Sequence, residues 1–294
     1  MATKHIIPGI DDPTCGIAVA AKQLIASGVG EDGEVWVHSM WSPWVIKASI
    51  KALLTSKKLV RMPHGCTDPE KLKYHWHKKR WVAPIERWLF RRADRIVATC
   101  EDEVEWIKKF EPRVKRVEIV RLSGHVENIA KVESQDSHKE SKDRKEDKVR
   151  LLYVGRLHPL KGVEYLLEAM PKDCKLVIIG RDEGEGKKLK KIVACRGLDV
   201  EFKGVVSEAE KEAAYKWCDV FVLPTLSENF GLVIAEALER GKHVITTDGA
   251  PAWGDGNTYG GRLVYLKGFR DGTGEARVSL LRDSIDQLMK RNHV

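Results

Sequence analysis

The stretch Asp219–Gly241, DVFVLPTLSENFGLVIAEALERG, changes from one structural pattern to another within a few residues. Its first part is a short apolar, β-prone run, which predicts a buried strand that ends at Pro224. Its last part carries apolar residues at helical spacing, which predicts a helix that begins at about Phe230 or Gly231. A buried strand followed by a short loop and a helix is the repeating unit of a parallel α/β sheet.

The same alternation of strand and helix extends over most of the chain. Strands are predicted over residues 4–8, 34–39, 58–63, 95–99, 114–120, 150–155, 174–180, 200–204, 219–224, 243–247 and 261–266. Helices are predicted over residues 16–27, 43–56, 84–93, 101–110, 162–170, 187–197, 207–218 and 231–241. This order predicts an α/β protein with parallel sheets.

A polar segment divides the alternation in two. Residues 131–150, KVESQDSHKESKDRKEDKVR, are nearly all charged or polar, and such a composition cannot bury enough apolar surface to fold by itself. We therefore predict a Rossmann-like domain over residues 1–130, a charged linker or loop over 131–149, and a second Rossmann-like domain over 150–294. Because open parallel sheets bind ligands at the carboxyl ends of their strands, we expect a ligand cleft between the two domains.

The overall composition limits the classes of protein. The chain has 294 residues, of which 43% are hydrophobic, and its formal net charge of +8 favours an anionic partner such as nucleic acid, an acidic membrane or a nucleotide diphosphate. The six cysteines have no CxxC spacing, so neither a zinc site nor a disulfide framework is indicated. The stretch MATKHIIPGIDD lacks the charged start and apolar run of a signal peptide, and no stretch of the sequence approaches the apolar length of a membrane span. We expect a cytoplasmic protein, or one attached peripherally to the inner face of the cell membrane.

The loop after the strand predicted at 150–155 is a candidate anion site. It reads GRLHPLKG from Gly155 to Gly162. Gly155 permits a close backbone approach, while Arg156 and Lys161 place two cations near the start of a helix, where anions are already favoured. The loop matches neither GxxxxGK[ST] nor GxGxxG, so it predicts neither a P-loop nor a dinucleotide-binding turn.

Two glutamates of the opening stretch are candidates for binding the rest of such a ligand. Glu228 lies in the loop after the strand, and Gly231 would let a phosphate approach the first free N–H groups of the helix. Glu236 lies about one and a half turns into the helix, where its carboxylate can accept hydrogen bonds from the hydroxyls of a ribose.

Both loops also have purely structural explanations. GRLHPLKG can be an ordinary strand-to-helix turn with exposed charges. In the second loop, Ser227 or Asn229 can cap the helix, and Glu236 can pair with Arg240 four residues later. The residues alone leave these alternatives open.

As a set, the segments GRLHPLKGVEYLLEAM, LVIIG, VEFKGVV, DVFVLPTLSENFGLVIAEAL and GKHVITTD resemble the nucleotide-sugar-binding domain of retaining glycosyltransferases of family 4. Those enzymes have the GT-B fold, in which two Rossmann-like domains face a cleft. The resemblance implies that Arg156 and Lys161 neutralise the diphosphate of a UDP- or GDP-type sugar donor. It also implies that Glu228 binds the transferred sugar and that Glu236 binds the ribose. Backbone groups would complete the phosphate site at Gly155, Asn229, Phe230, Gly231 and Leu232.

The first half is similar to the acceptor domain of the same family. In IPGIDDPTCGIAVAAKQL, Gly16 matches a glycine loop that approaches the donor diphosphate, although Cys15 stands where a second glycine is common. The segments VHSMWSPW and RMPHGCTDP resemble loops that line the cleft in relatives that build bacterial surface polysaccharide or lipopolysaccharide. There His64 matches a histidine that contacts the donor sugar, whereas a lone histidine more often has a structural role.

Two departures from the family concern the length of the chain. The connection ASGVGEDGE leads directly from the first helix to the next strand, so we expect a shortened N-terminal domain that lacks one strand–helix portion. The chain also stops soon after LLRDSIDQLMKRNHV, without the long final helix that commonly crosses back to the first domain.

The segment Lys73–Arg92, KYHWHKKRWVAPIERWLFRR, mixes tryptophans with many cations. Such a composition is typical of an interfacial helix whose aromatic residues lie among lipid headgroups while Lys and Arg contact anionic lipid. Peripheral membrane contact of this kind would bring the enzyme to a lipid-linked acceptor. The alternative is a half-buried helix whose tryptophans pack in the core. No recognised nucleic-acid motif accompanies this segment, so we expect no nucleic-acid partner.

The predicted function is transfer of a hexose-type sugar from a nucleotide diphosphate donor to a saccharide or lipid-linked acceptor, with retention of configuration. We expect no cofactor and no metal, because fixed cations and helix N–H groups can stabilise the departing diphosphate. The residues expected to act in catalysis are His64, Arg156, Lys161 and Glu228. The alternatives are a nucleotide-sugar hydrolase or epimerase with the same donor site, and a noncatalytic binding or scaffold subunit with the GT-B fold.

Overall fold

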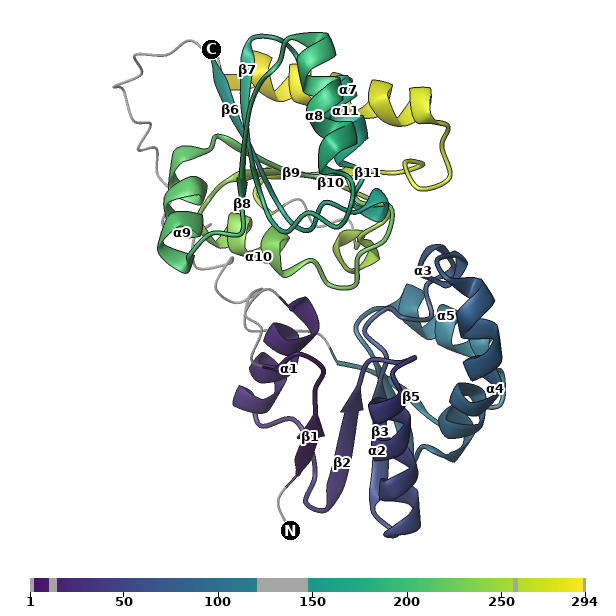
Figure 1. The fold of residues 1–294 in the computed structure, drawn as a ribbon. Coiled ribbons are helices and arrows are strands. Elements are labelled where there is room, and N and C mark those ends of the chain that lie inside the picture. Colours follow the sequence, from purple (N-terminus) through teal and green to yellow (C-terminus); the bar gives the residue numbers. More distant parts are fainter. Residues whose placement is uncertain (1–2, 11–14, 121–147, 256–258, 293–294) are drawn as a thin grey trace. The chain divides into compact units, whose positions relative to one another are not determined.

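The computed structural model describes residues 3–10, 15–120, 148–255 and 259–292. The chain divides into two compact units, Met1–Leu122 and Ser123–Val294, and each contains one parallel sheet with helices (Figure 1). Most of the linker predicted over 131–149 lies outside the described residues. The first strand of the second unit begins at Val149.

The first unit is built on five parallel strands that follow one another in sequence order across the sheet. The strands are β1 (Lys4–Ile6), β2 (Glu34–His38), β3 (Lys58–Met62), β4 (Arg95–Ala98) and β5 (Val117–Ile119). The helices are α1 (Gly16–Ala26), α2 (Pro43–Leu54), α3 (Pro69–Lys73), α4 (Trp76–Arg92) and α5 (Glu101–Phe110). Residues 27–33 connect α1 directly to β2, so no further strand–helix portion lies between them, as expected.

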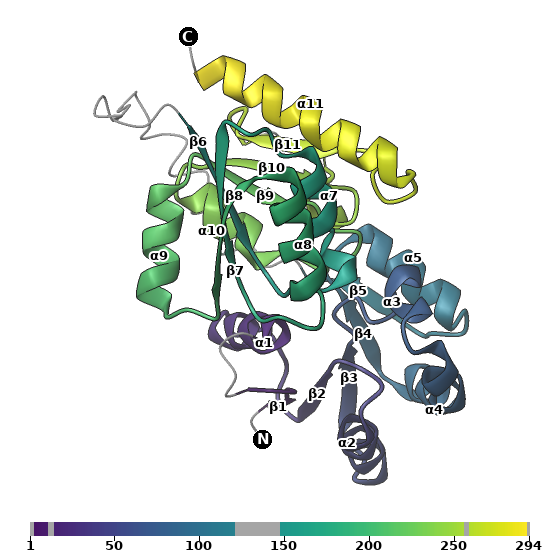
Figure 2. The ribbon, with the colours of Figure 1, turned by 45° about the horizontal axis from the view of Figure 1, so that its top comes forward.

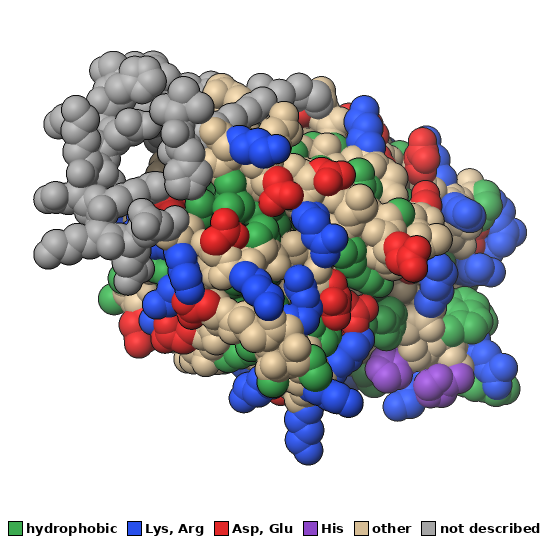
Figure 3. Space-filling model, turned by 90° about the horizontal axis from the view of Figure 1, so that it is seen from above, with side chains coloured by type: hydrophobic (Ala, Val, Ile, Leu, Met, Phe, Trp, Pro, Cys, Tyr) green, Lys and Arg blue, Asp and Glu red, His purple; other side chains and the backbone are tan. Residues whose placement is uncertain are grey.

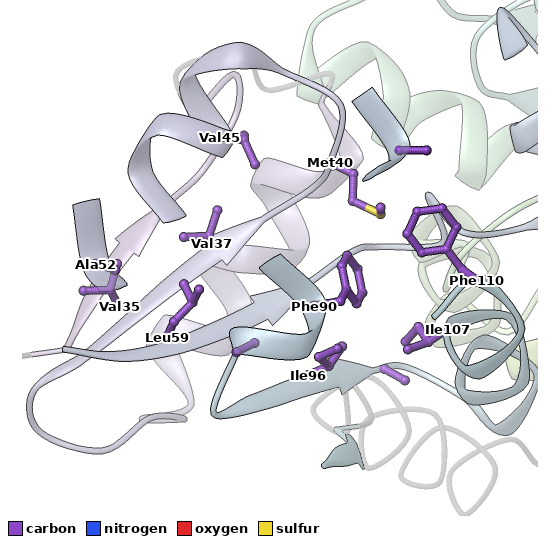
Figure 4. Packing of buried hydrophobic residues seen from close by; sticks show 13 residues of the cluster. Val35, Val37, Met40, Val45, Ala52, Leu59, Phe90, Ile96, Ile107 and Phe110 are labelled. Carbon is purple, nitrogen blue, oxygen red and sulfur yellow. The ribbon is translucent and has the colours of Figure 1, made fainter. Parts of the chain in front are cut away.

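The core of the first unit lies between one face of this sheet and helices α2, α4 and α5. Successive side chains of a strand point to opposite faces, and Val35 and Val37 of β2 both belong to the buried apolar cluster. Figure 4 shows them packed with Val45 of α2, Phe90 of α4 and Ile107 of α5. Full burial of such side chains stabilises the fold by about 1.5–3 kcal/mol each.

Helix α4 begins at Trp76, well before the start predicted from the sequence at Pro84. Proline is favoured in the first turn of a helix, which is compatible with a start at Pro84, whereas both interpretations of the segment 73–92 already treated it as one helix. In the structure Pro84 lies inside the helix, and the residue before the helix, His75, has a left-handed backbone with φ of 54°.

The second unit contains six parallel strands in the order β11-β10-β9-β6-β7-β8. The strands are β6 (Val149–Val154), β7 (Cys174–Ile179), β8 (Asp199–Gly204), β9 (Val220–Leu223), β10 (His243–Thr247) and β11 (Leu263–Leu266). The helices are α7 (Val163–Ala169), α8 (Gly186–Arg196), α9 (Glu208–Trp217), α10 (Leu232–Glu239) and α11 (Gly274–Asn292), with short 3₁₀ turns at Pro159–Lys161 and Pro251–Trp253. Helix α11, to which the sequence analysis assigned no boundaries, packs against α7.

The strand order reverses between β6 and β9, which are neighbours in the sheet. From β6 the chain moves one way to β7 and β8, and from β9 it moves the other way to β10 and β11. Right-handed crossovers then place α7 and α8 on one face of the sheet and α9 and α10 on the other, as Figure 2 shows. The loops that leave the carboxyl ends of β6 and β9 therefore lie side by side at a topological switch point, where α/β sheets bind ligands.

The surface of the described residues mixes both signs of charge. On the face seen in Figure 3, Lys and Arg side chains are interspersed with Asp and Glu. Among the described helices, none combines the length and the apolar character needed to cross a membrane.

Candidate functional site

The loops after β6 and β9 are joined through their backbones. Gly162, at the end of the first loop, has a φ of +63°, and a Cβ atom on it would lie 2.0 Å from the carbonyl oxygen of Pro224. The N–H of Leu226 donates to the carbonyl of Leu160 at 2.8 Å. Only glycine leaves room for this approach, so Gly162 allows the loop after β6 to pack directly against the loop after β9.

The loops after β7 and β10 join the same assembly. A Cβ on Gly180, after β7, would lie 1.9 Å from the carbonyl oxygen of Gly155, and a Cβ on Gly249, after β10, would lie 2.1 Å from that of Thr225. The N–H of Glu228 donates to the Gly249 carbonyl at 2.7 Å. We call these four loops, residues 155–162, 180–183, 224–231 and 248–250, the loop platform.

Lys161 and Glu228 meet at the junction of the first two loops. The Lys161 ammonium pairs with the Glu228 carboxylate and lies 3.4 Å from the carbonyl oxygen of Ser227. The Lys161 side chain is only 9% exposed, whereas that of Glu228 is 22% exposed. The two residues that the family resemblance assigned to the diphosphate and to the sugar are therefore in direct contact. Removing either partner would leave a charge poorly compensated in a partly buried place.

Arg156 is held at the surface of the loop platform by a residue that the sequence analysis missed. Its Nη1 donates to both carboxylate oxygens of Glu183, at 3.0 and 2.9 Å, and its side chain is 54% exposed. Its carbonyl oxygen accepts a hydrogen bond from the hydroxyl of Tyr153 at 2.9 Å. Burial and the nearby Glu228 carboxylate raise the pKa of Tyr153, so this hydroxyl keeps its proton. The only local indication of Glu183 in the sequence is the acidic segment RDEGEG, which directly follows β7.

Glu236 lies on α10, where two side chains of α9 hold its carboxylate. The hydroxyl of Tyr215 donates to Oε2 at 3.0 Å, and the Lys211 ammonium lies 3.4 Å from both carboxylate oxygens. Burial works against the charge on Lys211, yet hydrogen bonds to Glu208 and the Glu236 carboxylate leave its pKa raised. Tyr215 and Lys211 are not among the residues predicted from the sequence, although their four-residue spacing places both on one face of a helix.

The purely structural explanation of this segment, a Glu236–Arg240 ion pair and a helix capped by Ser227 or Asn229, is not what the structure shows. Arg240 pairs with the carboxylate of Glu212 and binds only the backbone carbonyl of Glu236. The residue before α10 is Gly231, with a φ of +71°, so neither Ser227 nor Asn229 occupies the N-cap position of this helix.

The segment before α10 is fixed by packing as well as by hydrogen bonds. Phe230 is buried, its ring centroid lies 5.4 Å from that of Trp253, and its carbonyl accepts a hydrogen bond from the Trp253 indole. The N–H of Asn229 donates to the Glu228 carboxylate at 3.1 Å. The helix proper begins at Leu232, slightly later than predicted, and its first N–H groups follow directly on the loop platform.

His64 and Gly16 belong to the first unit. His64 follows β3 with a φ of +52° and is 3% exposed, and burial together with the charge of Lys71 lowers its pKa to about 3. Its Nε2 lies 2.8 Å from Nδ1 of His38. Gly16 is the first residue of α1, and a Cβ on it would meet nothing within 4 Å. Contacts within the first unit therefore do not require a glycine at position 16.

Two family models match the chain, one in each half. Residues 134–255 match the model of glycosyl transferases group 1, and residues 34–121 match that of Glycosyltransferase Family 4. The chain belongs to the family 4 glycosyltransferases. The resemblance stated from the sequence is thereby confirmed.

Curated relatives of this chain match it over part of their length. The phosphatidyl-myo-inositol mannosyltransferase of Mycolicibacterium smegmatis is 34% identical over 149 residues, which are 47% of this chain and 37% of the relative. An uncharacterized glycosyltransferase of Methanocaldococcus jannaschii is 37% identical over 109 residues, 35% of this chain and 28% of the relative. The chain thus spans well under half of the length of these two relatives.

Solved structures show the fold. The Anabaena protein HepE in complex with UDP and glucose has a TM-score of 0.62 at 18% identity, covering 95% of this chain and 76% of HepE. WaaG, a glycosyltransferase involved in lipopolysaccharide biosynthesis, has a TM-score of 0.61 at 14% identity, covering 97% of this chain and 89% of WaaG. Together with the two parallel-sheet units, this likeness confirms the predicted GT-B fold.

Proposed function

We propose that this family member transfers a hexose-type sugar from a nucleotide diphosphate donor to a saccharide or lipid-linked saccharide, with retention of configuration. The observation that carries the proposal is the Lys161–Glu228 pair, which lies at the switch point of the second sheet just before the N-terminus of α10. A cation, a carboxylate and free helix N–H groups at one place suit a ligand that joins a diphosphate to a sugar.

The diphosphate is the part of the donor that Arg156 and Lys161 would bind. As the bond to the sugar breaks, negative charge builds on the departing diphosphate, and preorganised cations and N–H groups lower the barrier. Arg156 can turn from Glu183 to a phosphate at little cost, because such an exposed ion pair contributes only about 0–1 kcal/mol. With these groups supplying the charge, we propose a reaction that needs neither a metal nor a cofactor.

The two glutamates would bind the two sugars of the donor. Glu236, oriented by Tyr215 and Lys211, is proposed to accept hydrogen bonds from the ribose. Glu228 is proposed to bind the transferred sugar when the diphosphate takes its place beside Lys161. The assignment of His64 to the donor sugar and of Gly16 to the diphosphate rests on the family resemblance and is part of the same proposal.

Peripheral contact with anionic lipid through residues 73–92 is a second part of the proposal. Helix α4 buries one side, where the Glu86 carboxylate pairs with Arg61 at 2.9 Å. Its other side exposes Trp76, Trp81 and Trp88, by 44%, 74% and 38%. Exposed cations accompany them at Lys78, Arg80, Arg87 and Arg92. Exposed tryptophans beside cations favour the headgroup region of an anionic bilayer.

Sedimentation with phosphatidylglycerol vesicles tests the lipid contact. We expect the protein to bind these vesicles and not phosphatidylcholine vesicles. Trp81→Ala should weaken the binding several-fold, while Trp44→Ala, a matched control at a 42% exposed tryptophan of α2, should not. Equal binding by Trp81→Ala and the wild-type chain would refute the role of this helix face.

Donor binding and product analysis test the transfer itself. A panel of UDP- and GDP-sugars should contain one that raises the melting temperature of the protein, since a ligand of the folded state stabilises it. Lys161→Ala should abolish that shift. With acceptor present, the product should keep the anomeric configuration of the donor. Consumption of the donor without any acceptor would indicate hydrolysis or epimerisation instead, and donor binding without turnover would indicate a noncatalytic subunit.

A further inference from the structure

Three histidines lie next to one another on one face of the first sheet. In the parallel pairing, His5 of β1 is opposite Trp36 of β2, and His38 of β2 is opposite Met62 of β3. Because side chains alternate between the faces of a sheet, His5 and His38 point to the same side. His64, two residues after the end of β3, lies against His38.

The three imidazoles form a continuous hydrogen-bonded row. His5 Nδ1 lies 3.1 Å from His38 Nε2, and His38 Nδ1 lies 2.8 Å from His64 Nε2. Adjacent ring planes are inclined by only 28°, with centroids 5.4 and 5.1 Å apart. The N–H bonds and lone pairs of imidazole lie in the ring plane, so nearly coplanar rings direct each donor at the next acceptor. We call these residues the histidine ladder.

Both bonds run in the same sense, so the tautomers of the ladder depend on one another. A neutral imidazole has one donor nitrogen and one acceptor nitrogen. Either all three rings carry the proton on Nε2, and each bond points from His64 toward His5, or all three carry it on Nδ1, and each bond points from His5 toward His64. Any mixed state places two donors or two acceptors face to face at a short distance. Isolated neutral histidine side chains prefer the Nε2–H form, so the neutral ladder favours the first arrangement.

We propose that His5 and His38 are positioning residues for His64, and that a positive charge on His5 switches His64 from the Nε2–H to the Nδ1–H tautomer. Charged His5 donates from both nitrogens, which obliges His38 to accept at Nε2 and to donate from Nδ1. His64 must then accept at Nε2 and carry its own proton on Nδ1. The proposal relies on the proposed function only in assigning a sugar contact to His64.

The switch conserves protons at each step. In the switch, His64 Nδ1 takes one proton from solvent, the Nε2 proton of His64 passes to Nδ1 of His38, and the Nε2 proton of His38 passes to Nδ1 of His5. His5 keeps its own Nε2 proton, so the one added proton leaves one net charge, and that charge resides on His5. The charge on His5 and the hydrogen-bonding group that His64 offers therefore change together.

His5 is the ring on which the charge would reside. It is half-buried, while His38 and His64 are buried, and burial lowers the pKa of His38 to about 2 and that of His64 to about 3. Burial also lowers the pKa of His5, but the carboxylate of Glu34 opposes that shift. The charge of Lys71 also acts on the ladder, where it disfavours a charge on His64.

Nitrogen NMR of the full-length protein, labelled with ¹⁵N in its histidines, tests the switch without any substrate. Between pH 8 and pH 5 we expect the His5 shifts to report a titration. With the same midpoint, the two His64 nitrogens should exchange their protonated and unprotonated shifts while the ring stays neutral. His5→Phe keeps a ring at the half-buried site and removes both nitrogens, so His64 should then keep one tautomer across this range. His77→Phe, a change at an exposed histidine of α4, should leave the switch unaltered.

Three results would overturn the proposal: a His64 tautomer that ignores the His5 titration, one that follows pH equally in His5→Phe, or direct protonation of His64 in this range. Donor binding is measured separately with Lys161→Ala. A ladder that fails the NMR test in a protein that binds a nucleotide sugar refutes the switch alone. A ladder that passes in a protein that binds none refutes the proposed function alone.

Discussion

Replacing Gly162 with alanine tests whether the backbone contact between the first two loops shapes the donor site. The new Cβ would lie 2.0 Å from the carbonyl oxygen of Pro224, whereas ordinary van der Waals contact begins at about 3.4 Å. The two loops must therefore move apart by roughly an ångström or more, and Lys161 and Glu228 move with them. Gly197, at the end of α8, provides a matched control, because its φ of +62° nearly equals the +63° of Gly162 and its Cβ would meet nothing within 4 Å.

The two variants share one energetic cost and differ in the other. A non-glycine residue in the left-handed region costs about 1–2 kcal/mol, which applies to both positions. Overpacking adds about 1–3 kcal/mol, which applies only at Gly162. We expect Gly197→Ala to lower the free energy of unfolding by about 1–2 kcal/mol, and Gly162→Ala to lower it by about 2–5 kcal/mol.

Urea unfolding followed by circular dichroism measures the stability, and calorimetric titration with the nucleotide sugar measures the affinity. Gly162→Ala should weaken donor binding at least about tenfold, which corresponds to about 1.4 kcal/mol, while Gly197→Ala should keep the wild-type affinity. Equal losses of stability in the two variants, or an unchanged donor affinity in Gly162→Ala, would refute the view that this contact sets the geometry of the site.

Three further predictions concern the ligand and pH. Glu236→Gln should weaken UDP or GDP and the intact nucleotide sugar equally, whereas Glu228→Gln should weaken only the nucleotide sugar, and calorimetry separates the two patterns. Transferase activity should persist in EDTA, because Arg156 and Lys161 are proposed to supply the positive charge that stabilises the departing diphosphate. Below pH 6.5 the unfolded chain protonates His38 and His64 while the folded chain holds their pKa values at about 2 and 3, so the folded state binds fewer protons and loses stability as pH falls. The slope is about 1.4 kcal/mol per pH unit for each histidine, and urea unfolding at pH 6.5 and 4.5 should reveal a combined loss of about 4–5 kcal/mol attributable to them.

Local sequence patterns were sufficient for the strands and for most helices. The runs at β6 and β9 are apolar and end at Gly155 and Pro224, so both pattern and punctuation indicated their ends. The predicted start of helix α4 at Pro84 was too late. Proline is common at the first position of a helix, but Pro84 lies inside this helix. Its first turns are polar and cationic, so apolar periodicity gave no sign of them.

Part of the candidate site depends on strand order, which the sequence does not display. The family resemblance placed Lys161 and Glu228 in one site, and their contact follows from β6 and β9 being neighbours. The side chains that hold Arg156 and Glu236 come from segments far away in sequence, and no local pattern pairs them. The same holds for the histidine ladder, whose members meet only through the registers of β1, β2 and β3.

The main-chain construction of the loop platform has a consequence for how donor preference can be altered. Its floor consists of glycines and carbonyl groups in direct contact, so exchanging side chains there disturbs the architecture before it can tune selectivity. Attempts to engineer a different sugar preference should therefore keep the closely packed glycines of the loop platform and change exposed side chains at its edge.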